Sequence, residues 1–376
     1  MNASTVVDFT SSLVLGYEHG SQSLAAWSRL TTGVPAALRE DRLAETVAQT
    51  VASAQQAEAG LVSRSTLHAL SDALGELPRK GDLVAVDEFS YPIARWAVLR
   101  AADRGAIVRC YPHHCPDRLI PSPGRRLFLV TDGWCPGCNR PAPLARLQRL
   151  VQDCDGLVVV DDTLAAGVLG RRAAPGSAAL GSVASGSAPG SAALGSAAGW
   201  FGAGEGTVRW AGIESPGILW IASLAKAFGS PLALTTGDRA TIRRLADGGT
   251  RWHSSPPSAA DLAAAAAVLA DPVGADGRRQ RLETKVFRIR RGLRAAGLPP
   301  VGLPFPLVCF VPPAGPDAGR WQRALRSRGL LTVVQRPRCR PGSVIGLLVR
   351  ADHRDDEIDR LVDESARLAV AGRAVA

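Results

Sequence analysis

Lysine is scarce in this chain. Of its 44 basic side chains only three are lysine, at positions 80, 226 and 285. Arginine stays protonated near neutral pH, whereas a lysine acts as a base or forms a Schiff base once its pKa is lowered. In a chain that uses arginine almost everywhere, a lysine therefore calls for a chemical reason.

Long apolar runs and aromatic clusters are also missing. No run of 18 apolar residues occurs, and Met1–Thr5 does not begin a secretion signal, so we expect a cytoplasmic protein without a membrane partner. The net charge is +10, but the arginines are scattered and aromatic residues make up only 5% of the chain. Without a basic and aromatic stripe, we expect no nucleic-acid partner.

Cysteine is present in an odd number, seven, with no sign of secretion, which predicts reduced thiols. Cys135-Pro136-Gly137-Cys138 is a single C-x-x-C pair. A zinc site would need further ligands, and the nearby candidates are Cys110, His113, His114 and Cys115. The favoured alternative is two thiols on a loop without a metal.

Apolar strand-like runs alternate with amphipathic stretches between residues 55 and 240, which predicts an α/β fold with a mainly parallel sheet. The expected strands are 83–86, 106–109, 127–130, 157–160 and 218–221. The expected helices are 43–57, 92–104, 144–153 and 259–270. In such a sheet, ligands bind at the carboxyl ends of the strands.

Changes in amino-acid composition and pattern divide the chain. We expect an N-terminal arm at 1–42, a large domain at 43–272 and a smaller C-terminal α+β domain at 273–376. Within the large domain, 171–206 is rich in Gly, Ser, Ala and Pro, and a nonapeptide at 174–182 recurs at 188–196. This composition predicts a flexible low-complexity insertion without catalytic content.

Two polar residues follow buried strands and point to a cofactor. Lys226 lies on a turn after the strand 217–222, in the pattern Ser223-x-x-Lys226, and Asp161 ends the strand 158–160. A buried carboxylate needs a cation, and a protonated pyridine ring is one. Alternatively, Asp161 caps a helix or binds a backbone amide, but the lysine downstream favours the cofactor.

Two further segments would complete a cofactor site. The strand-turn-helix junction Gly60–His68 carries Ser63, Arg64, Ser65 and Thr66, which either bind a phosphate or simply cap a helix. Tyr91, in Asp87–Pro92, is placed after a strand and could stack on an aromatic ring.

The chain resembles the pyridoxal-phosphate enzymes of aspartate-aminotransferase fold (fold type I), and most closely the α-oxoamine synthases, such as 8-amino-7-oxononanoate synthase. The matching segments, in family order, are 6–12, Leu15-Gly16, Asp87-x-x-Ser90-Tyr91-Pro92, Val130–Gly133, Ala142–Leu144, Asp161–Gly170, Ser223–Gly229 and Ser254–Pro257. The most specific of these are Asp161–Gly170 and Ser223–Gly229.

The resemblance implies a seven-stranded, mainly parallel sheet, a homodimer with shared sites and pyridoxal 5'-phosphate as cofactor. It implies that Lys226 forms the internal aldimine and acts as the proton-transfer base, and that Asp161 binds the pyridinium of the cofactor. Ser223 and the 63–66 turn bind the phosphate, while Tyr91 replaces the family's ring-stacking histidine. Ser254 or Ser255 reaches the phosphate of the neighbouring subunit.

The implied reaction condenses an amino acid with an acyl thioester of coenzyme A or a carrier protein. An aminotransferase or a catalytically degenerate cofactor-binding protein is the alternative. Three departures from the family motivate it: Leu164 stands for a histidine, Cys135–Cys138 replaces the motif Phe-Ser-Met-Asp-Gly, and the substrate-binding arginine is missing near Gly346. Arg350 is its nearest substitute.

Overall fold

The computed structural model describes residues 6–20, 41–119, 124–172, 199–313 and 317–373, which form two compact units. The larger unit comprises Glu18–Trp134 and Pro141–Val273, and the smaller comprises Met1–Tyr17, Cys135–Arg140 and Gly274–Ala376. The smaller unit thus includes part of the expected N-terminal arm and a short piece from the middle of the expected large domain.

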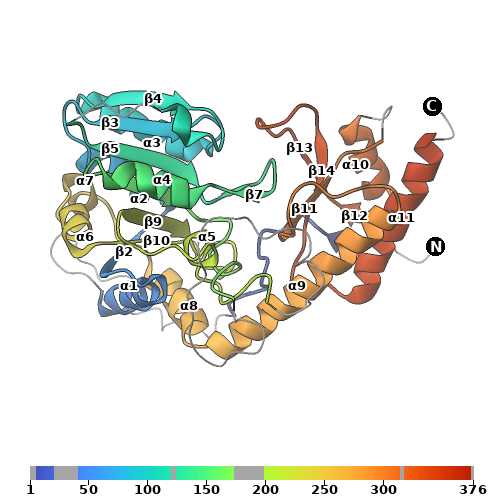
Figure 1. The fold of residues 1–376 in the computed structure, drawn as a ribbon. Helices are drawn as coiled ribbons and strands as arrows, with labels where there is room; N and C mark the ends of the chain where they lie inside the picture. The colour runs from blue at the N-terminus through green and yellow to red at the C-terminus, as the bar shows by residue number, and fades with distance from the viewer. Residues whose placement is uncertain (1–5, 21–40, 120–123, 173–198, 314–316, 374–376) are drawn as a thin grey trace. The chain divides into compact units, whose positions relative to one another are not determined.

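The larger unit is built on a seven-stranded sheet (Figure 1). In spatial order its strands are β2 (Ala59–Ser63), β10 (Ala233–Gly237), β9 (Ile218–Ser223), β8 (Leu157–Asp161), β5 (Leu127–Asp132), β3 (Leu83–Asp87) and β4 (Ile107–Tyr111). Strand β10 is antiparallel to both of its neighbours, and the other paired strands are parallel. The expected α/β fold with a mainly parallel seven-stranded sheet is confirmed.

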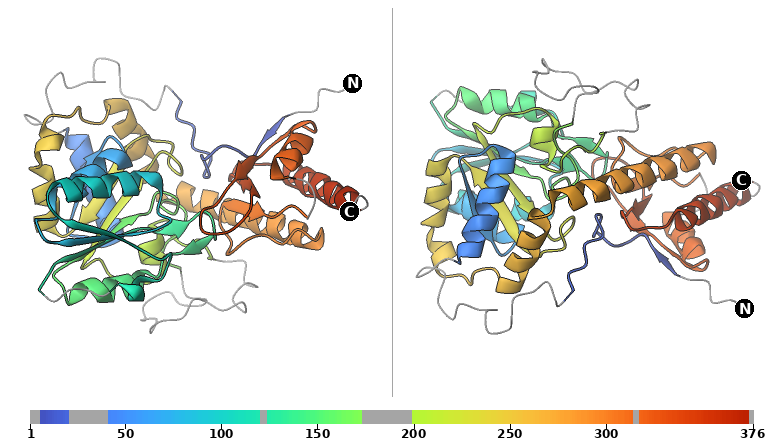
Figure 2. Two further views of the ribbon diagram at one scale, coloured as in Figure 1. Left: turned by 90° about the horizontal axis from the view of Figure 1, so that it is seen from above. Right: turned by 90° about the horizontal axis from the view of Figure 1, so that it is seen from below.

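Helices cover both faces of this sheet (Figure 2). One face packs against α1 (Arg42–Gln55), α4 (Leu144–Gln152) and α8 (Ala259–Leu269), and the other against α2 (Thr66–Glu76), α3 (Pro92–Asp103) and α6 (Arg239–Ala246). Alternation along β8 explains the two cores: Val158 and Val160 enter one, and Val159 enters the other. Burying each such side chain contributes roughly 1.5–3 kcal/mol.

In the smaller unit, the described residues after 273 and before 18 form short sheets and helices. Strand β1 (Val7–Asp8) pairs with β12 (Leu330–Leu331), and β14 (Val344–Leu348) lies between β11 (Leu307–Phe310) and β13 (Val333–Gln335). The helices are α9 (Pro272–Ala295), α10 (Ala318–Arg326) and α11 (Asp355–Arg373). Among the described residues, no helix has the length and apolar character needed to cross a membrane.

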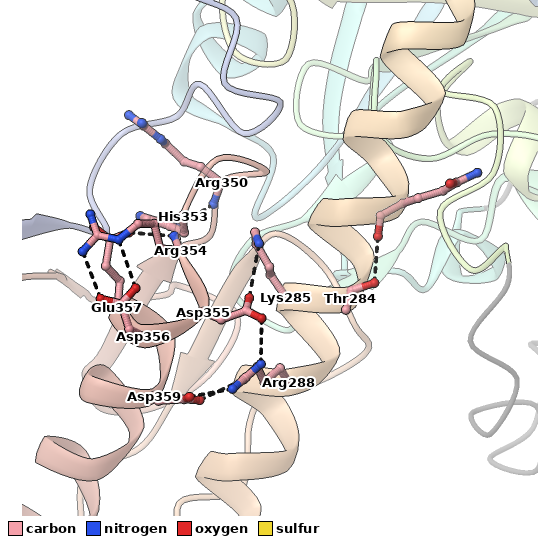
Figure 3. Close-up of polar contacts among 11 residues, drawn as sticks. Thr284, Lys285, Arg288, Arg350, His353, Arg354, Asp355, Asp356, Glu357 and Asp359 are labelled. Carbon is pink, nitrogen blue, oxygen red and sulfur yellow. Dashed lines mark hydrogen bonds and ion pairs between the residues drawn. The ribbon is translucent and has the colours of Figure 1, made fainter.

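Ionic contacts join α9 to the start of α11 (Figure 3). The Arg288 guanidinium lies 2.9 Å from Asp355 and 2.5 Å from Asp359, and Lys285 Nζ lies 3.5 Å from the Asp355 carboxylate. Lys285 therefore has a structural role, because it helps to join the two helices. The acidic groups in the first turn of α11 also interact favourably with the helix dipole.

The expected C-terminal boundary of the low-complexity insertion 171–206 is wrong. Residues 173–198 lie outside the described residues, but Trp200 and Phe201 are buried. The Glu205 carboxylate accepts 2.8 and 3.1 Å hydrogen bonds from the backbone and the side chain of Arg171. Residues 199–206 pack against the fold because they include two aromatic side chains and a carboxylate. The Gly-, Ser- and Ala-rich part of the segment lacks such side chains.

Candidate active site

Four polar residues end neighbouring strands at one edge of the large sheet. Asp87 ends β3, Asp132 ends β5, Asp161 ends β8 and Ser223 ends β9. Asp132 is paired in register with Asp161, and β9 continues the parallel arrangement. The structure thus brings Asp161 and the Ser223–Lys226 turn to the carboxyl edge, where parallel sheets bind ligands.

Asp161 and Lys226 interact electrostatically at this edge. The Asp161 carboxylate is 8% exposed and accepts a 3.1 Å hydrogen bond from the Thr163 amide. Burial raises its pKa, while the bonds from Thr163 and the positive charge of Lys226 oppose that rise. The pKa of Asp161 stays raised overall, so Lys226 and Thr163 do not fully offset the cost of burying its charge.

Thr163 connects the two strands that carry these groups. Its hydroxyl accepts a 3.0 Å hydrogen bond from the Ser223 amide, and the Ser223 hydroxyl in turn accepts one from the Ala225 amide at 3.2 Å. Thr163 belongs to the family segment Asp161–Gly170, but the resemblance implies no role for it. Its signal was a hydroxyl two residues after the strand-end acid.

Asp162, next to Asp161, is fully buried and serves the fold. Its carboxylate accepts hydrogen bonds from the Thr207 hydroxyl at 2.6 Å, the Thr207 amide at 2.7 Å and the Trp220 indole at 2.8 Å. Burial raises the pKa of Asp162 to about 6, against the effect of these bonds. A Cβ at Gly133 or Gly206 would collide with the carboxylate, so both glycines make room for it.

The hydroxyl-rich turn lies at the same edge of the sheet. Ser63 at the end of β2 and Ser223 at the end of β9 are both paired with Ala233, the first residue of the strand between them. The Ser65 hydroxyl caps α2 by accepting from the His68 amide, at 3.5 Å. Ser63 and Thr66 are buried and Arg64 is exposed.

A further cation lies beside this turn. Arg251, on the short helix α7 (Gly249–Trp252), donates a 2.8 Å hydrogen bond to the carbonyl of Val62, the residue before Ser63. Nothing in the sequence distinguishes Arg251, because arginines are so frequent in this chain. Hydroxyls, an arginine and the start of an eleven-residue helix together suit a phosphate group.

Tyr91 is anchored to a strand end through its backbone. Its amide donates to both oxygens of Asp132, at 2.9 and 3.1 Å, while its side chain is 57% exposed and its ring is open to stacking. On the adjacent strand, Asp87 accepts a 2.8 Å hydrogen bond from His113. Burial tends to raise the pKa of Asp87, but bonds from His113 and two backbone amides lower it overall.

The turn that carries Lys226 packs closely against its surroundings. Gly167 has φ +81°, and a Cβ there would lie 2.5 Å from Cβ of Ala227 and 3.0 Å from the Phe228 ring. Nε2 of His19 lies 2.8 Å from the Phe228 carbonyl oxygen. Glycine at 167 therefore lets the loop after β8 approach the lysine turn.

The expected residue Ser254 follows Arg251 closely, and its amide donates a 3.2 Å hydrogen bond to the Arg251 carbonyl. Ser254 and Ser255 follow α7, and Ser255 is exposed. Leu164 is partly exposed. In the smaller unit, the Arg350 guanidinium is bonded to both oxygens of Asp352, with Nε at 2.8 Å from one of them. Arg350 therefore already has a carboxylate partner within its own loop.

A cavity of about 780 Å³ lies at the opposite edge of the sheet. Its lining includes Arg125 and Arg126, just before β5, and Asp155, just before β8. These positions precede the strands rather than follow them. The cavity is thus separate from the group around Asp161 and Lys226.

The side chains at the carboxyl edge fit pyridoxal phosphate. A buried acid that needs a cation lies near an amine, and hydroxyls at the ends of β2 and β9 adjoin a helix N-terminus. The cofactor offers a ring nitrogen, an aldehyde and a phosphate to these three kinds of group. Fold and site define a fold type I pyridoxal-phosphate enzyme.

Comparison with known proteins gives the family. Residues 36–364 match the model of the family "Aminotransferase class I and II". The chain belongs to this family and is a pyridoxal-phosphate-dependent transferase.

Among its relatives, a putative 8-amino-7-oxononanoate synthase of Thermosynechococcus vestitus is 28% identical, over 96% of this chain and 88% of that protein. An 8-amino-7-oxononanoate synthase of Alkalilimnicola ehrlichii is 27% identical, over 81% of this chain and 71% of that protein. The resemblance to the α-oxoamine synthases is confirmed.

Solved structures share the fold. Serine palmitoyltransferase of Sphingomonas wittichii has a TM-score of 0.79 at 15% identity, over 98% of this chain and 88% of that one. An 8-amino-7-oxononanoate synthase of Francisella tularensis has a TM-score of 0.71 at 16% identity, over 97% of this chain and 98% of that one. The expected fold type I architecture is confirmed.

Proposed function

We propose that the chain condenses an amino acid with an acyl thioester, as an α-oxoamine synthase. The observation that carries this proposal is the buried Asp161 beside Lys226 at the carboxyl edge of a fold type I sheet. Relatives named 8-amino-7-oxononanoate synthase cover most of the chain.

In the proposed mechanism, each group at the edge has one task. Pyridoxal phosphate, when bound, supplies an electron sink for negative charge that develops at the α-carbon of the amino acid. Asp161 would hold the positive ring nitrogen, and Tyr91 would stack on the ring. Lys226 Nζ removes the α-proton and later returns one. Ser223, the 63–66 turn and Arg251 would hold the phosphate and so keep the ring close to Lys226.

The proposal includes a cytoplasmic homodimer with shared sites, in which Ser254 or Ser255 reaches the partner's phosphate. The exposed apolar side chains Trp96 and Leu99 on α3 support it, at 60% and 58% exposure, since a second subunit would cover them. Mixing a Lys226→Ala chain with a Ser254→Ala/Ser255→Ala chain should restore activity that neither has alone. Absence of any restoration would contradict shared sites.

The reaction is tested by thiol release. The protein, loaded with pyridoxal phosphate, is incubated with a panel of amino acids crossed with acyl-coenzyme A and acyl-carrier thioesters, and free thiol is measured. We expect release only when both substrates are present, lost in Lys226→Ala and kept in Lys80→Ala, which removes a lysine outside the site. Cofactor binding without thiol release from any pair would overturn the proposal.

An aminotransferase is the second candidate, favoured by one observation. Arg350, the nearest substitute for the family's substrate-binding arginine, is bonded to Asp352. Loss of the contact between the family's arginine and the substrate carboxylate would alter substrate choice. Ketone formation from an amino acid and a 2-oxo acid, without thiol release, would identify this activity.

A further inference from the structure

Three cysteines come together in the smaller unit. The sulfur atoms of Cys135, Cys138 and Cys339 all lie within 4.8 Å of one another, and those of Cys135 and Cys339 are 3.7 Å apart. The first two flank the turn between β6 (Trp134–Cys135) and β7 (Arg140–Pro141), and Cys339 lies between β13 and β14. Cys339 follows Cys135 by 204 residues, so no local sequence pattern connects it to the pair.

The separation of the sulfurs suits a shared metal ion. Zinc–sulfur bonds of about 2.3 Å in tetrahedral geometry place two sulfurs about 3.8 Å apart. A disulfide would need about 2.05 Å. The 3.7 Å between Cys135 and Cys339 agrees with the first arrangement, and the x-x spacing of Cys135 and Cys138 is that of a zinc-binding pair.

The turn that presents Cys135 and Cys138 is held in place by its neighbour Asn139. Asn139 is fully buried, with φ +55°, and its Nδ2 donates a 2.7 Å hydrogen bond to the Leu307 carbonyl on β11. Its amide donates to the Cys135 carbonyl at 2.9 Å, which closes the turn. The C-x-x-C pair is thus fixed to the small unit rather than left on a loose loop.

Gly137 makes room for the third sulfur. A Cβ at this position would collide with Sγ of Cys339. The loop between β13 and β14 therefore lies very close to the backbone of the C-x-x-C turn. A side chain at position 137 would prevent this approach. This is a second feature of the turn that serves the meeting of the three sulfurs.

Cysteine binds a divalent metal as a thiolate, so binding to these three residues releases their thiol protons.

We propose that Cys135, Cys138 and Cys339 bind one Zn²⁺ as thiolates, with a nitrogen or oxygen ligand in the fourth position. Binding forms three zinc–sulfur bonds and releases three thiol protons to solvent, with no change of oxidation state. The ion would fasten the turn between β6 and β7 to the loop between β13 and β14. This structural site is independent of the transferase reaction.

The test measures zinc itself. Full-length protein, purified under reducing conditions without chelator, is analysed for metal by mass spectrometry and then titrated with Zn²⁺ against a chromophoric chelator. We expect one Zn²⁺ per chain, bound about a hundredfold more weakly or worse in Cys339→Ser. Cys154→Ser, which removes a partly exposed thiol of the larger unit, should bind zinc like the unmodified chain.

A second measurement covers the case in which Cys339→Ser fails to fold. In the unmodified chain, stoichiometric Zn²⁺ should protect Cys135, Cys138 and Cys339 from alkylation, as located by peptide mapping, and X-ray absorption should show three sulfur neighbours. Equal zinc affinity of Cys339→Ser and Cys154→Ser would overturn the proposal. So would a Cys135–Cys339 disulfide in a protein that takes up no zinc after reduction.

Discussion

The Ser223 amide donates a 3.0 Å hydrogen bond to the hydroxyl of Thr163. Thr163 also donates its own amide to the Asp161 carboxylate, at 3.1 Å. One residue therefore holds both the buried acid at the end of β8 and the start of the turn that carries Lys226. The separation of the acid and the amine is set by this backbone connection rather than by a direct bond between them.

Replacing Thr163 tests this connection. Valine keeps the shape but leaves the Ser223 amide without its acceptor, which we expect to cost roughly 1–3 kcal/mol of stability. The turnover number should fall about tenfold, because the lysine turn shifts against Asp161, and Thr163→Ser should restore it. Full activity of Thr163→Val, or equal loss in both variants, would show that the hydroxyl does not position the turn.

Asp161→Asn tests the proposed partner of the ring nitrogen. The amide oxygen of asparagine still accepts from the Thr163 amide, so the fold should survive, but a neutral group does not hold a positive ring. We expect cofactor binding with a loss of at least about a hundredfold in turnover. Steady-state thiol release and the visible absorbance of the bound cofactor measure the two effects separately. An unchanged turnover number would remove Asp161 from the mechanism.

Most strands and helices of the larger unit could be predicted because each carries a plain local pattern, although α6 was not expected. Valine runs such as 158–160 predicted β8, and Pro92 marked the start of α3 where the structure has it. The polar residues that follow those strands predicted the site, since parallel strands end at a common edge. Strand β10 was missed, because nothing local distinguishes a short antiparallel strand among parallel ones.

Long-range relationships could not be predicted from one sequence. Cys339 meets Cys135 across 204 residues, and Trp200 and Phe201 lie at the end of a repetitive segment whose composition hides them. Arg251 is one of many arginines, and only its bond to Val62 distinguishes it. In each case the information lies in tertiary packing rather than in the pattern of neighbouring residues.

Asp162 should make stability fall as pH rises. Because the pKa is about 6 in the folded chain and 3.8 in the reference state, the native state holds the proton more tightly between about pH 4 and pH 6. Protonation of Asp162 therefore contributes roughly 3 kcal/mol to the free energy of unfolding below this pH window. This contribution is lost above the window.

Asp162→Asn measures this contribution, because asparagine does not titrate. The difference in the free energy of unfolding, unmodified chain minus variant, should decrease between pH 4 and pH 7 in chemical denaturation. Parallel pH profiles of the two proteins would contradict the raised pKa. The hydrogen bonds from Thr207 and Trp220 affect the offset between the profiles, and their slopes carry the prediction.

Gly167→Ala should disturb the lysine turn through a contact. Gly167 and Gly212 both have positive φ, +81° and +69°, so alanine is strained at either position. A Cβ at 167 would also press on Ala227 and Phe228, whereas a Cβ at 212 meets nothing within 4 Å. Gly212→Ala is therefore the matched control for backbone strain alone, which should cost about 1 kcal/mol.

The two variants should separate in cofactor affinity. We expect Gly167→Ala to lose more stability than Gly212→Ala, and to weaken pyridoxal-phosphate binding about tenfold or more, because the residues displaced are the two that follow Lys226. Gly212→Ala should bind the cofactor normally. Equal cofactor affinity in the two variants would mean that the turn tolerates displacement, and that close packing after β8 does not help to fix the lysine.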